Sequence, residues 1–395
     1  MDGVYHDDEL TNTRRLYLQQ APLEVVIASL PSNWWTNLDG QTKLVHALSC
    51  DEYQPDVPYQ RRVFKHLLSI LETNNADVVS CSGEEEEMQH QPHEELIARL
   101  ANTYINSNGD TITDSSQWSH RIYDLEPSSS SCSSKTLTMR VRSVLGGGYE
   151  TGGRVWDSAL LLGAWIMSTT TSSSSCNNVS SMLWEGRNVI ELGCGTGIVG
   201  CILALHANLA SLSFTDCEAN VLVNMRHNVE VNLPRDMWKN IYIGSLDWCR
   251  PKDSPWLGGN DYDINVPLAL DEEDGCSGAS ARSMPPPPDT IIASDVVYDP
   301  TVVASLVDTI VTLLNMPAAA DIDDDSRRRQ RVAYVAAEER NPTTWTVFKN
   351  ELQNRNLIIV DRSTEARVAI QMQNTFWVSN ETQDRVHVLE LKLPS

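Results

Sequence analysis

Hydrophobic side chains follow two different spacings along the chain. Residues 59–72 and 93–105 carry apolar side chains every three or four positions, a spacing that predicts two amphipathic helices. Pro58 precedes the first of them, where a proline can begin a helix. Because no cluster of catalytic residue types precedes about residue 145, we assign residues 1–145 to a mainly helical N-terminal extension.

From residue 146 onward, short apolar runs alternate with amphipathic segments. This alternation predicts an α/β domain over residues 146–395, with a parallel sheet covered by helices on both faces. The last two strands could close the edge of the sheet as a hairpin. The expected strands cover residues 188–192, 212–215, 241–244, 290–293, 332–336, 357–361 and 386–392, and the expected helices cover 198–207, 218–232, 301–314 and 343–354.

Low-complexity segments interrupt both parts of the chain. Residues 83–91 include four consecutive glutamates, 128–134 are almost pure serine, and 271–288 join an acidic cluster to four prolines. Such segments bury too little apolar surface to offset the entropy of ordering, so we expect mobile loops there and at 169–175 and 321–331. The acidic runs either solvate these loops or offer a docking surface to a basic partner.

The charge balance narrows the classes of partner. The 395 residues contain 30 Lys and Arg against 53 Asp and Glu, a net charge of -23. A chain this acidic is poorly suited to bind phosphate backbones, so we expect no direct nucleic-acid binding. No apolar run is long enough for a membrane span, and no secretory signal is visible. Nine cysteines without a C-x-x-C pair favour reduced thiols in the cytoplasm and no metal site.

The first candidate site is a glycine-rich turn within residues 189–200, VIELGCGTGIVG. Gly193, Gly195 and Gly197 follow a buried strand and precede a helix, where backbone amides can approach a ligand. The spacing is G-x-G-x-G, whereas a dinucleotide loop has its third glycine one position later, which disfavours an NAD oxidoreductase. Taken alone, the glycines are also compatible with a purely structural turn.

A second group of candidates follows the next strands. Asp216 ends the second strand, where its carboxylate can accept hydrogen bonds from both hydroxyls of a ribose, or can instead cap the following helix. Trp156 and Trp248 could pack in the core or against a ligand. Asp295 and Tyr298 follow the fourth strand, at the edge where open α/β sheets bind ligands.

Together these motifs resemble the class I, Rossmann-like methyltransferases that use S-adenosylmethionine, and more narrowly family 16, the seven-strand protein-lysine methyltransferases. That family combines a tryptophan before motif I, E-x-G-x-G-x-G, an acidic residue after motif I, L-x-W, and D-x-x-Y. The matching residues here are Trp156, Glu191 with Gly193, Gly195 and Gly197, Asp216, Trp248, and Asp295 with Tyr298. The resemblance implies a seven-strand sheet whose last strand is antiparallel.

Within the family, residues 58–72, 214–232, 293–307 and 332–352 are most similar to the branch that methylates a lysine of translation elongation factor 2. The resemblance therefore implies lysine methylation of that factor by a cytoplasmic monomer that needs no metal. The alternatives are another protein substrate, as for relatives of methyltransferase-like protein 22, or a small-molecule substrate. A non-catalytic assembly factor on the same fold would fail to bind S-adenosylmethionine.

The resemblance also assigns roles residue by residue. Asp295 and Tyr298 should flank the channel through which the lysine reaches the methyl group, with Asp295 acting as a positioning group or a base. Tyr298 could instead fill the core beneath the strand end. The residues expected to bind the cofactor are Trp156, Glu191, Gly193, Cys194, Gly195, Gly197, Asp216, Trp248 and Ser294.

Overall fold

The structure is a computed structural model, and the chain forms two compact units, Met1–Leu145 and Gly146–Ser395. The segments expected as loops at 83–91 and 128–134, and most of 271–288, lie outside the described residues. The residues that the structure describes are 8–49, 53–78, 94–108, 118–125, 135–142, 151–171, 183–257, 285–317 and 330–394.

The first unit is mainly helical, as expected, and it also holds a small sheet. The two helices expected from apolar spacing form as α4 (Val57–Val78) and α5 (Glu94–Asn108). An antiparallel pair, β1 (Trp118–Asp124) and β2 (Thr136–Arg142), was not expected. The other helices are α1 (Asp8–Leu18), α2 (Leu23–Ala28) and α3 (Leu38–Ala47). Buried aromatic rings at Tyr17 and Phe64 lie in this unit's core, 6.2 Å apart.

The second unit is built on one seven-stranded sheet, in the order β5-β4-β3-β6-β7-β9-β8. Its strands are β3 (Asn188–Leu192), β4 (Ser211–Asp216), β5 (Ile241–Ser245), β6 (Thr290–Ser294), β7 (Val332–Glu338), β8 (Ile358–Asp361) and β9 (Val386–Lys392). β9 runs antiparallel to both of its neighbours, whereas the pairs from β5 to β7 are parallel. The seven-strand sheet with an antiparallel last strand is thus confirmed.

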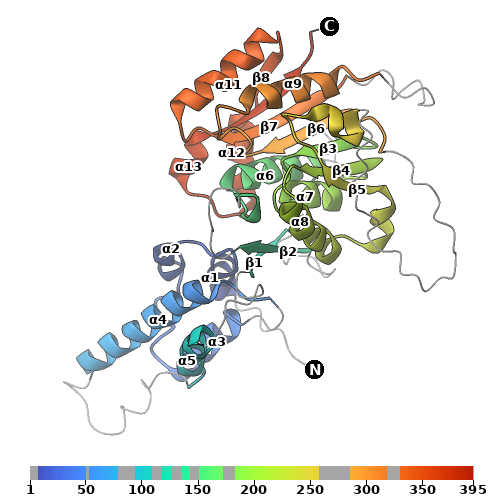
Figure 1. The fold of residues 1–395 in the computed structure, drawn as a ribbon. Helices are drawn as coiled ribbons and strands as arrows, with labels where there is room; N and C mark the ends of the chain where they lie inside the picture. Colours follow the sequence, from blue (N-terminus) through green and yellow to red (C-terminus); the bar gives the residue numbers. More distant parts are fainter. Residues whose placement is uncertain are drawn as a thin grey trace, which may run out of the picture. The chain divides into compact units, whose positions relative to one another are not determined.

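Helices cover both faces of this sheet (Figure 1). On one face α6 packs against α7 and α12, and on the other α9 packs against α11. Apolar side chains of β3, β6 and β7 fill the layer beneath α9 and α11. The helices are α6 (Asp157–Thr171), α7 (Ile198–His206), α8 (Ala219–Asn232), α9 (Val303–Leu314), α11 (Pro342–Asn354), α12 (Ser363–Gln373) and α13 (Asn380–Arg385).

Two expectations for this unit are wrong. Residues 169–171 are not part of a loop, because α6 continues to Thr171. The last two strands do pair with each other, but they form no simple hairpin, because α12 and α13 separate them along the chain. β9 therefore enters the sheet between β7 and β8 instead of adding at its edge.

Candidate functional site

The candidate residues gather where the parallel strands end. The glycine turn joins β3 to α7, Asp216 is the last residue of β4, and Ser294 is the last residue of β6. Because parallel strands end at one edge of their sheet, these residues share one rim. Ser294 is half-buried there and pairs with Ala336 of β7.

Left-handed backbone shapes the glycine turn. Gly193, Gly195 and Gly197 have φ of +60°, +53° and +77°, values that glycine adopts without steric cost. A Cβ at Gly193 would lie 2.9 Å from a methyl group of Val296 and 3.1 Å from the ring of Trp248. Space and conformation therefore both require glycine at this position.

Neighbouring elements hold the turn through hydrogen bonds. The Cys194 amide donates to the Thr215 carbonyl at 2.9 Å. The Gly195 amide donates to Asp216 Oδ2 at 3.2 Å. From α8, Asn228 Nδ2 donates to the Thr196 carbonyl at 3.0 Å in a buried bond. Asn228 was not expected from the sequence, because nothing near it in the chain marks a contact with the turn.

Glu191 lies beneath the turn, where it supports the backbone. Its side chain is buried, and Oε2 accepts a hydrogen bond from the Gly200 amide at 3.0 Å. Oε1 has no hydrogen-bond partner among the described residues. Burial raises the pKa of Glu191 to about 8, against the opposing effect of the Gly200 amide. Glu191 is therefore largely protonated at neutral pH, and a protonated carboxyl keeps a hydrogen-bond donor.

Asp216 connects the turn to the start of α8. Oδ1 accepts from the Glu218 amide at 3.2 Å, while Oδ2 accepts from Gly195. The N-cap of α8 is Glu218, so Asp216 is not the cap residue itself. Burial raises the pKa of Asp216, and the amides of Glu218 and Gly195 oppose this shift. Since an ionised carboxylate has about four acceptor positions, Asp216 keeps acceptor capacity for a ligand hydroxyl.

Trp248 and Cys194 form the walls beside the turn. The Trp248 atoms nearest to Gly193 are Cζ2 and Cη2 of the indole, and Cζ2 is two bonds from the ring nitrogen. That nitrogen is buried and has no hydrogen-bond partner among the described residues, although buried indole N–H groups usually find one. Cys194 is also buried, and burial raises the pKa of its thiol well above the usual value, so the thiol stays neutral.

Asp295 directly follows β6 in a left-handed conformation, with φ of +56°. Aspartate tolerates this region better than most side chains. Its amide donates to the Ala336 carbonyl at 2.8 Å, and its carboxylate pairs with Arg340 at 2.9 Å. Burial raises the pKa of Asp295, and the Arg340 guanidinium opposes the shift. Arg340 is a residue of the site to which the sequence motifs assigned no role.

Trp156 joins this group through Arg340. The guanidinium carbon of Arg340 lies 4.7 Å from the centre of the Trp156 ring. The Trp156 ring nitrogen donates to the Thr151 carbonyl at 3.1 Å, which fixes the plane of the indole. The structure thus brings the predicted residues Trp156 and Asp295 onto one guanidinium.

Tyr298 is 54% exposed, so the alternative that it fills the core is wrong. Its pKa is raised by partial burial and by the charge of Asp216. Tyr298 therefore belongs to the same rim as Asp216.

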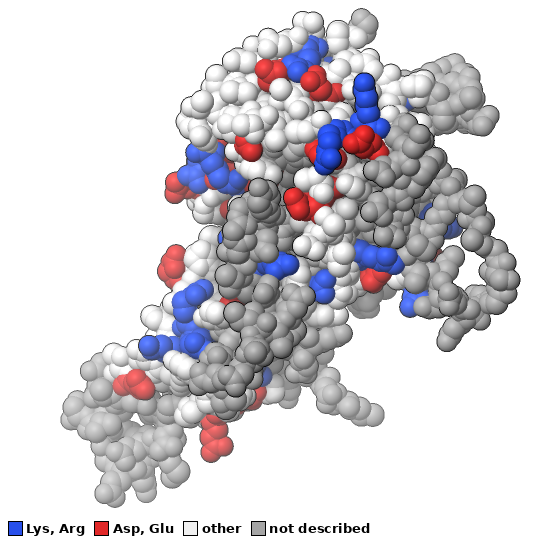
Figure 2. Space-filling view, in the orientation of Figure 1, with Lys and Arg blue, Asp and Glu red and all other residues white. Residues whose placement is uncertain are grey.

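The described residues offer few features for other kinds of site. Within them, no group of three or more His, Cys, Asp and Glu side chains could hold a metal ion. No described helix is long and apolar enough to cross a membrane. On the face drawn in Figure 2, the described basic and acidic side chains lie in small mixed groups and form no continuous basic field.

Comparison with known proteins finds a family that is similar to part of this chain. Residues 135–266 match a family described as lysine methyltransferase, which confirms the resemblance read from the motifs. The match covers the glycine turn, Asp216 and Trp248, whereas Asp295, Tyr298 and Arg340 lie beyond its end.

Three curated relatives are similar over longer stretches. An uncharacterised protein of Dictyostelium discoideum is 28% identical over 53% of this chain and 51% of its own length. The protein-lysine N-methyltransferase EEF2KMT of Homo sapiens is 27% identical over 77% of this chain and 72% of its own. The protein-lysine N-methyltransferase EFM3 of Chaetomium thermophilum is 22% identical over 64% and 60%. The chain thus spans about half to three quarters of these relatives.

Among solved structures, a precorrin-6y C5,15-methyltransferase from Geobacter metallireducens aligns with a TM-score of 0.31. It is 11% identical and covers 59% of this chain and 87% of that chain.

Proposed function

We propose, from the membership of residues 135–266 in the lysine methyltransferase family, that this chain transfers methyl groups from S-adenosylmethionine to a lysine side chain of a protein. The observation that carries the proposal is the left-handed glycine turn, held by Asp216 and closed by Trp248, beside Asp295 on the same rim. A ligand with hydroxyl and carboxylate groups suits this mixture of acceptors, amides and an indole donor.

The rim residues divide into two groups in this proposal. Asp216 accepts the ribose hydroxyls, and the glycine turn with Cys194 lines the methionine and ribose portion. Trp156, Trp248 and Ser294 form the remaining walls. Glu191 acts from beneath, because its bond to Gly200 fixes the geometry of the turn. Asp295 and Tyr298 border the lysine channel.

Methyl transfer from a sulfonium is an in-line displacement by a neutral amine. The new bond joins the lysine nitrogen to the methyl carbon, the carbon–sulfur bond breaks, and S-adenosylhomocysteine leaves as a neutral thioether. A free lysine, with a pKa of about 10.4, must first lose its proton. Alignment and partial removal of water by the aromatic walls would serve both requirements.

The proposed substrate is translation elongation factor 2, acted on in the cytoplasm by a monomer. Two of the relatives named above are protein-lysine N-methyltransferases, and the stretches that resemble the elongation factor 2 branch include the segment that carries Arg340. A net charge of -23 suits a target with a basic surface around its lysine.

The test incubates the purified chain with tritiated S-adenosylmethionine and a eukaryotic cytosolic extract, then separates the proteins on a gel. We expect one labelled band at elongation factor 2, absent with Asp216→Ala. Label on another protein would retain lysine methylation and discard the substrate. Cofactor binding without any labelled protein would favour a small-molecule substrate, and failure to bind the cofactor would contradict the proposal.

A further inference from the structure

Arg340 occupies a central place among the rim residues. It lies just after β7, 45 residues from Asp295 along the chain, yet its Nη2 bonds to Asp295 Oδ2 at 2.9 Å. Its guanidinium also faces the Trp156 ring at 4.7 Å. The Asp295 side chain is only 6% exposed, whereas that of Arg340 is 37% exposed. Arg340 is therefore the solvent-side partner of a nearly buried carboxylate.

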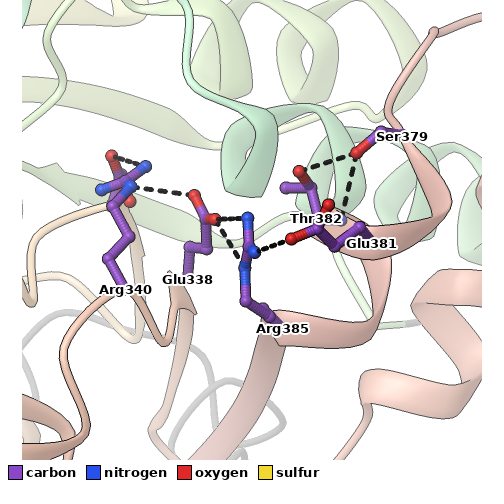
Figure 3. Close-up of polar contacts among 7 residues, drawn as sticks. Glu338, Arg340, Ser379, Glu381, Thr382 and Arg385 are labelled. Carbon is purple, nitrogen blue, oxygen red and sulfur yellow. Dashed lines mark hydrogen bonds and ion pairs between the residues drawn. The ribbon is translucent and has the colours of Figure 1, made fainter.

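A second carboxylate, that of Glu338, also binds Arg340 (Figure 3). Arg340 Nε pairs with Glu338 Oε2 at 2.8 Å. Glu338 Oε1 in turn binds Arg385 at 2.8 Å, and Arg385 binds Glu381 at 2.6 Å. Because the guanidinium makes directed bonds to both Asp295 and Glu338, it can move little without breaking one of them.

The charged side chains around Arg340 come from three segments of the chain. Asp295 follows β6, Glu338 ends β7, and Arg385 ends α13. Just before α6, which begins at Asp157, the Trp156 ring faces the guanidinium. Without Arg340, the charge of Asp295 would have no opposite partner among these groups, because Arg385 pairs with Glu338.

An unpaired buried carboxylate would hinder the reaction proposed above. It would attract the target lysine as an ammonium ion and retain its proton, and an ammonium nitrogen has no lone pair with which to attack the methyl group. A carboxylate already paired with a guanidinium attracts the amine less strongly as a cation. The same guanidinium also disfavours a second positive charge beside it.

We infer that Arg340 is a positioning residue for methyl transfer. Its guanidinium lies against Trp156 and neutralises Asp295, so that the lysine enters beside a paired carboxylate and loses its proton readily. This inference rests on the proposed lysine methyltransferase function. It assigns Arg340 a role through Asp295, with no direct contact to the reacting atoms.

The experiment compares Arg340→Gln and Arg340→Lys with the wild type. The substrate is the extract protein that the wild type labels, and kcat and KM are measured from about pH 6 to pH 10. Arg340→Gln removes the charge, so the site should bind a proton more tightly, whichever of Asp295 and the lysine carries it. In a plot of kcat against pH, we expect the midpoint of the acidic limb to move up by about one pH unit, with KM unchanged or lower. Arg340→Lys keeps the charge, and its limb should stay near that of the wild type.

A matched control is Arg362→Gln, which breaks a guanidinium–carboxylate pair of similar length, 2.8 Å to Glu390, between the end of β8 and β9. If Arg340→Gln lowers kcat by the same factor at every pH, with no shift of the acidic limb, Arg340 has only a structural role and the inference is overturned. A limb shift in Arg362→Gln as well would also overturn it. A wild type that binds S-adenosylmethionine by calorimetry but labels no protein would remove the proposed function, and the inference with it.

Discussion

Asp295 is the carboxylate proposed to border the lysine channel, and its replacement by asparagine tests that role. Asn tolerates φ of +56° and keeps the shape of the side chain, so the variant should fold. We expect kcat to fall by about tenfold to a hundredfold, because a misplaced amine reacts slowly. Affinity for S-adenosylmethionine, measured by calorimetry, should change less than about twofold, since Asp216 and the glycine turn are the residues proposed to bind it. Full turnover with normal cofactor affinity would remove Asp295 from the mechanism.

Glu191 gives a prediction about stability and pH. Its pKa is about 8 in the folded protein and 4.5 in the absence of burial, so the folded state retains a proton that the unfolded state has released. Folding stability is therefore lost as pH rises from about 4.5 through about 8. Glu191→Gln should abolish this loss and melt several degrees above the wild type at pH 8, with little difference at pH 4.5, since 1 kcal/mol corresponds to about 2–4 °C for a domain of this size.

The control for this measurement is Glu230→Gln, at a partly exposed carboxylate on α8 that pairs with Arg226. It should leave the pH dependence of the melting temperature unchanged. Equal pH profiles for the wild type and Glu191→Gln would show that Glu191 ionises normally, contrary to its burial.

Sequence reasoning worked at residue scale where the signal is local. The glycine turn and Asp216 follow their strands directly, so their presence at the rim could be read from spacing. Arg340 and Asn228 could not, because their importance comes from partners 45 and 32 residues away. Side chains that act across the fold carry no mark in the local pattern.

At the scale of elements, α8 supports the turn between β3 and α7 through Asn228. Asn228→Ala removes the donor and leaves the Thr196 carbonyl without this partner in a buried place, at a cost of about 1–3 kcal/mol. We expect the melting temperature to fall by several degrees and affinity for S-adenosylmethionine to fall by roughly fivefold, if about 1 kcal/mol of the cost reaches the bound state. Calorimetry and thermal melting check the two effects.

Asn232→Ala provides the matched control, because Asn232 lies one turn further along α8 and donates to the Asn228 carbonyl within the helix. This variant should bind the cofactor as the wild type does. If both variants lose the same affinity, α8 contributes only general stability and the bond to Thr196 has no particular role.

Elements with a regular apolar pattern were predicted well, and elements whose pattern polar residues interrupt were missed. β3 begins and ends at the residues expected, because it is apolar and is followed at once by glycine. β1 and β2 were missed because charged residues interrupt their alternation, and α12 because its apolar positions are few. The mistaken hairpin has a different cause: two strands that pair need not be linked by a turn.

At the scale of the whole molecule, the net charge of -23 predicts how binding of a protein substrate responds to salt. Long-range attraction to a basic target weakens as the Debye length shrinks from about 10 Å at 0.1 M to about 3 Å at 1 M. We expect KM for the protein substrate to rise several-fold between about 0.05 M and 0.3 M NaCl, with kcat nearly constant. Affinity for S-adenosylmethionine should vary much less. A KM independent of salt would show that charge does not guide this encounter.

The placement of β9 sets an order of events during synthesis. β8 leaves the ribosome first, but its partner in the sheet is β9, which is made 24 residues later. Until β9 inserts, the edge of β7 is open and its apolar residues can pair with other nascent chains. Arg385, which precedes β9 and anchors Glu338, arrives at the same moment. A nascent chain that has not yet made β9 and the residue before it therefore lacks Arg385, the partner of Glu338 in the charge network around Arg340.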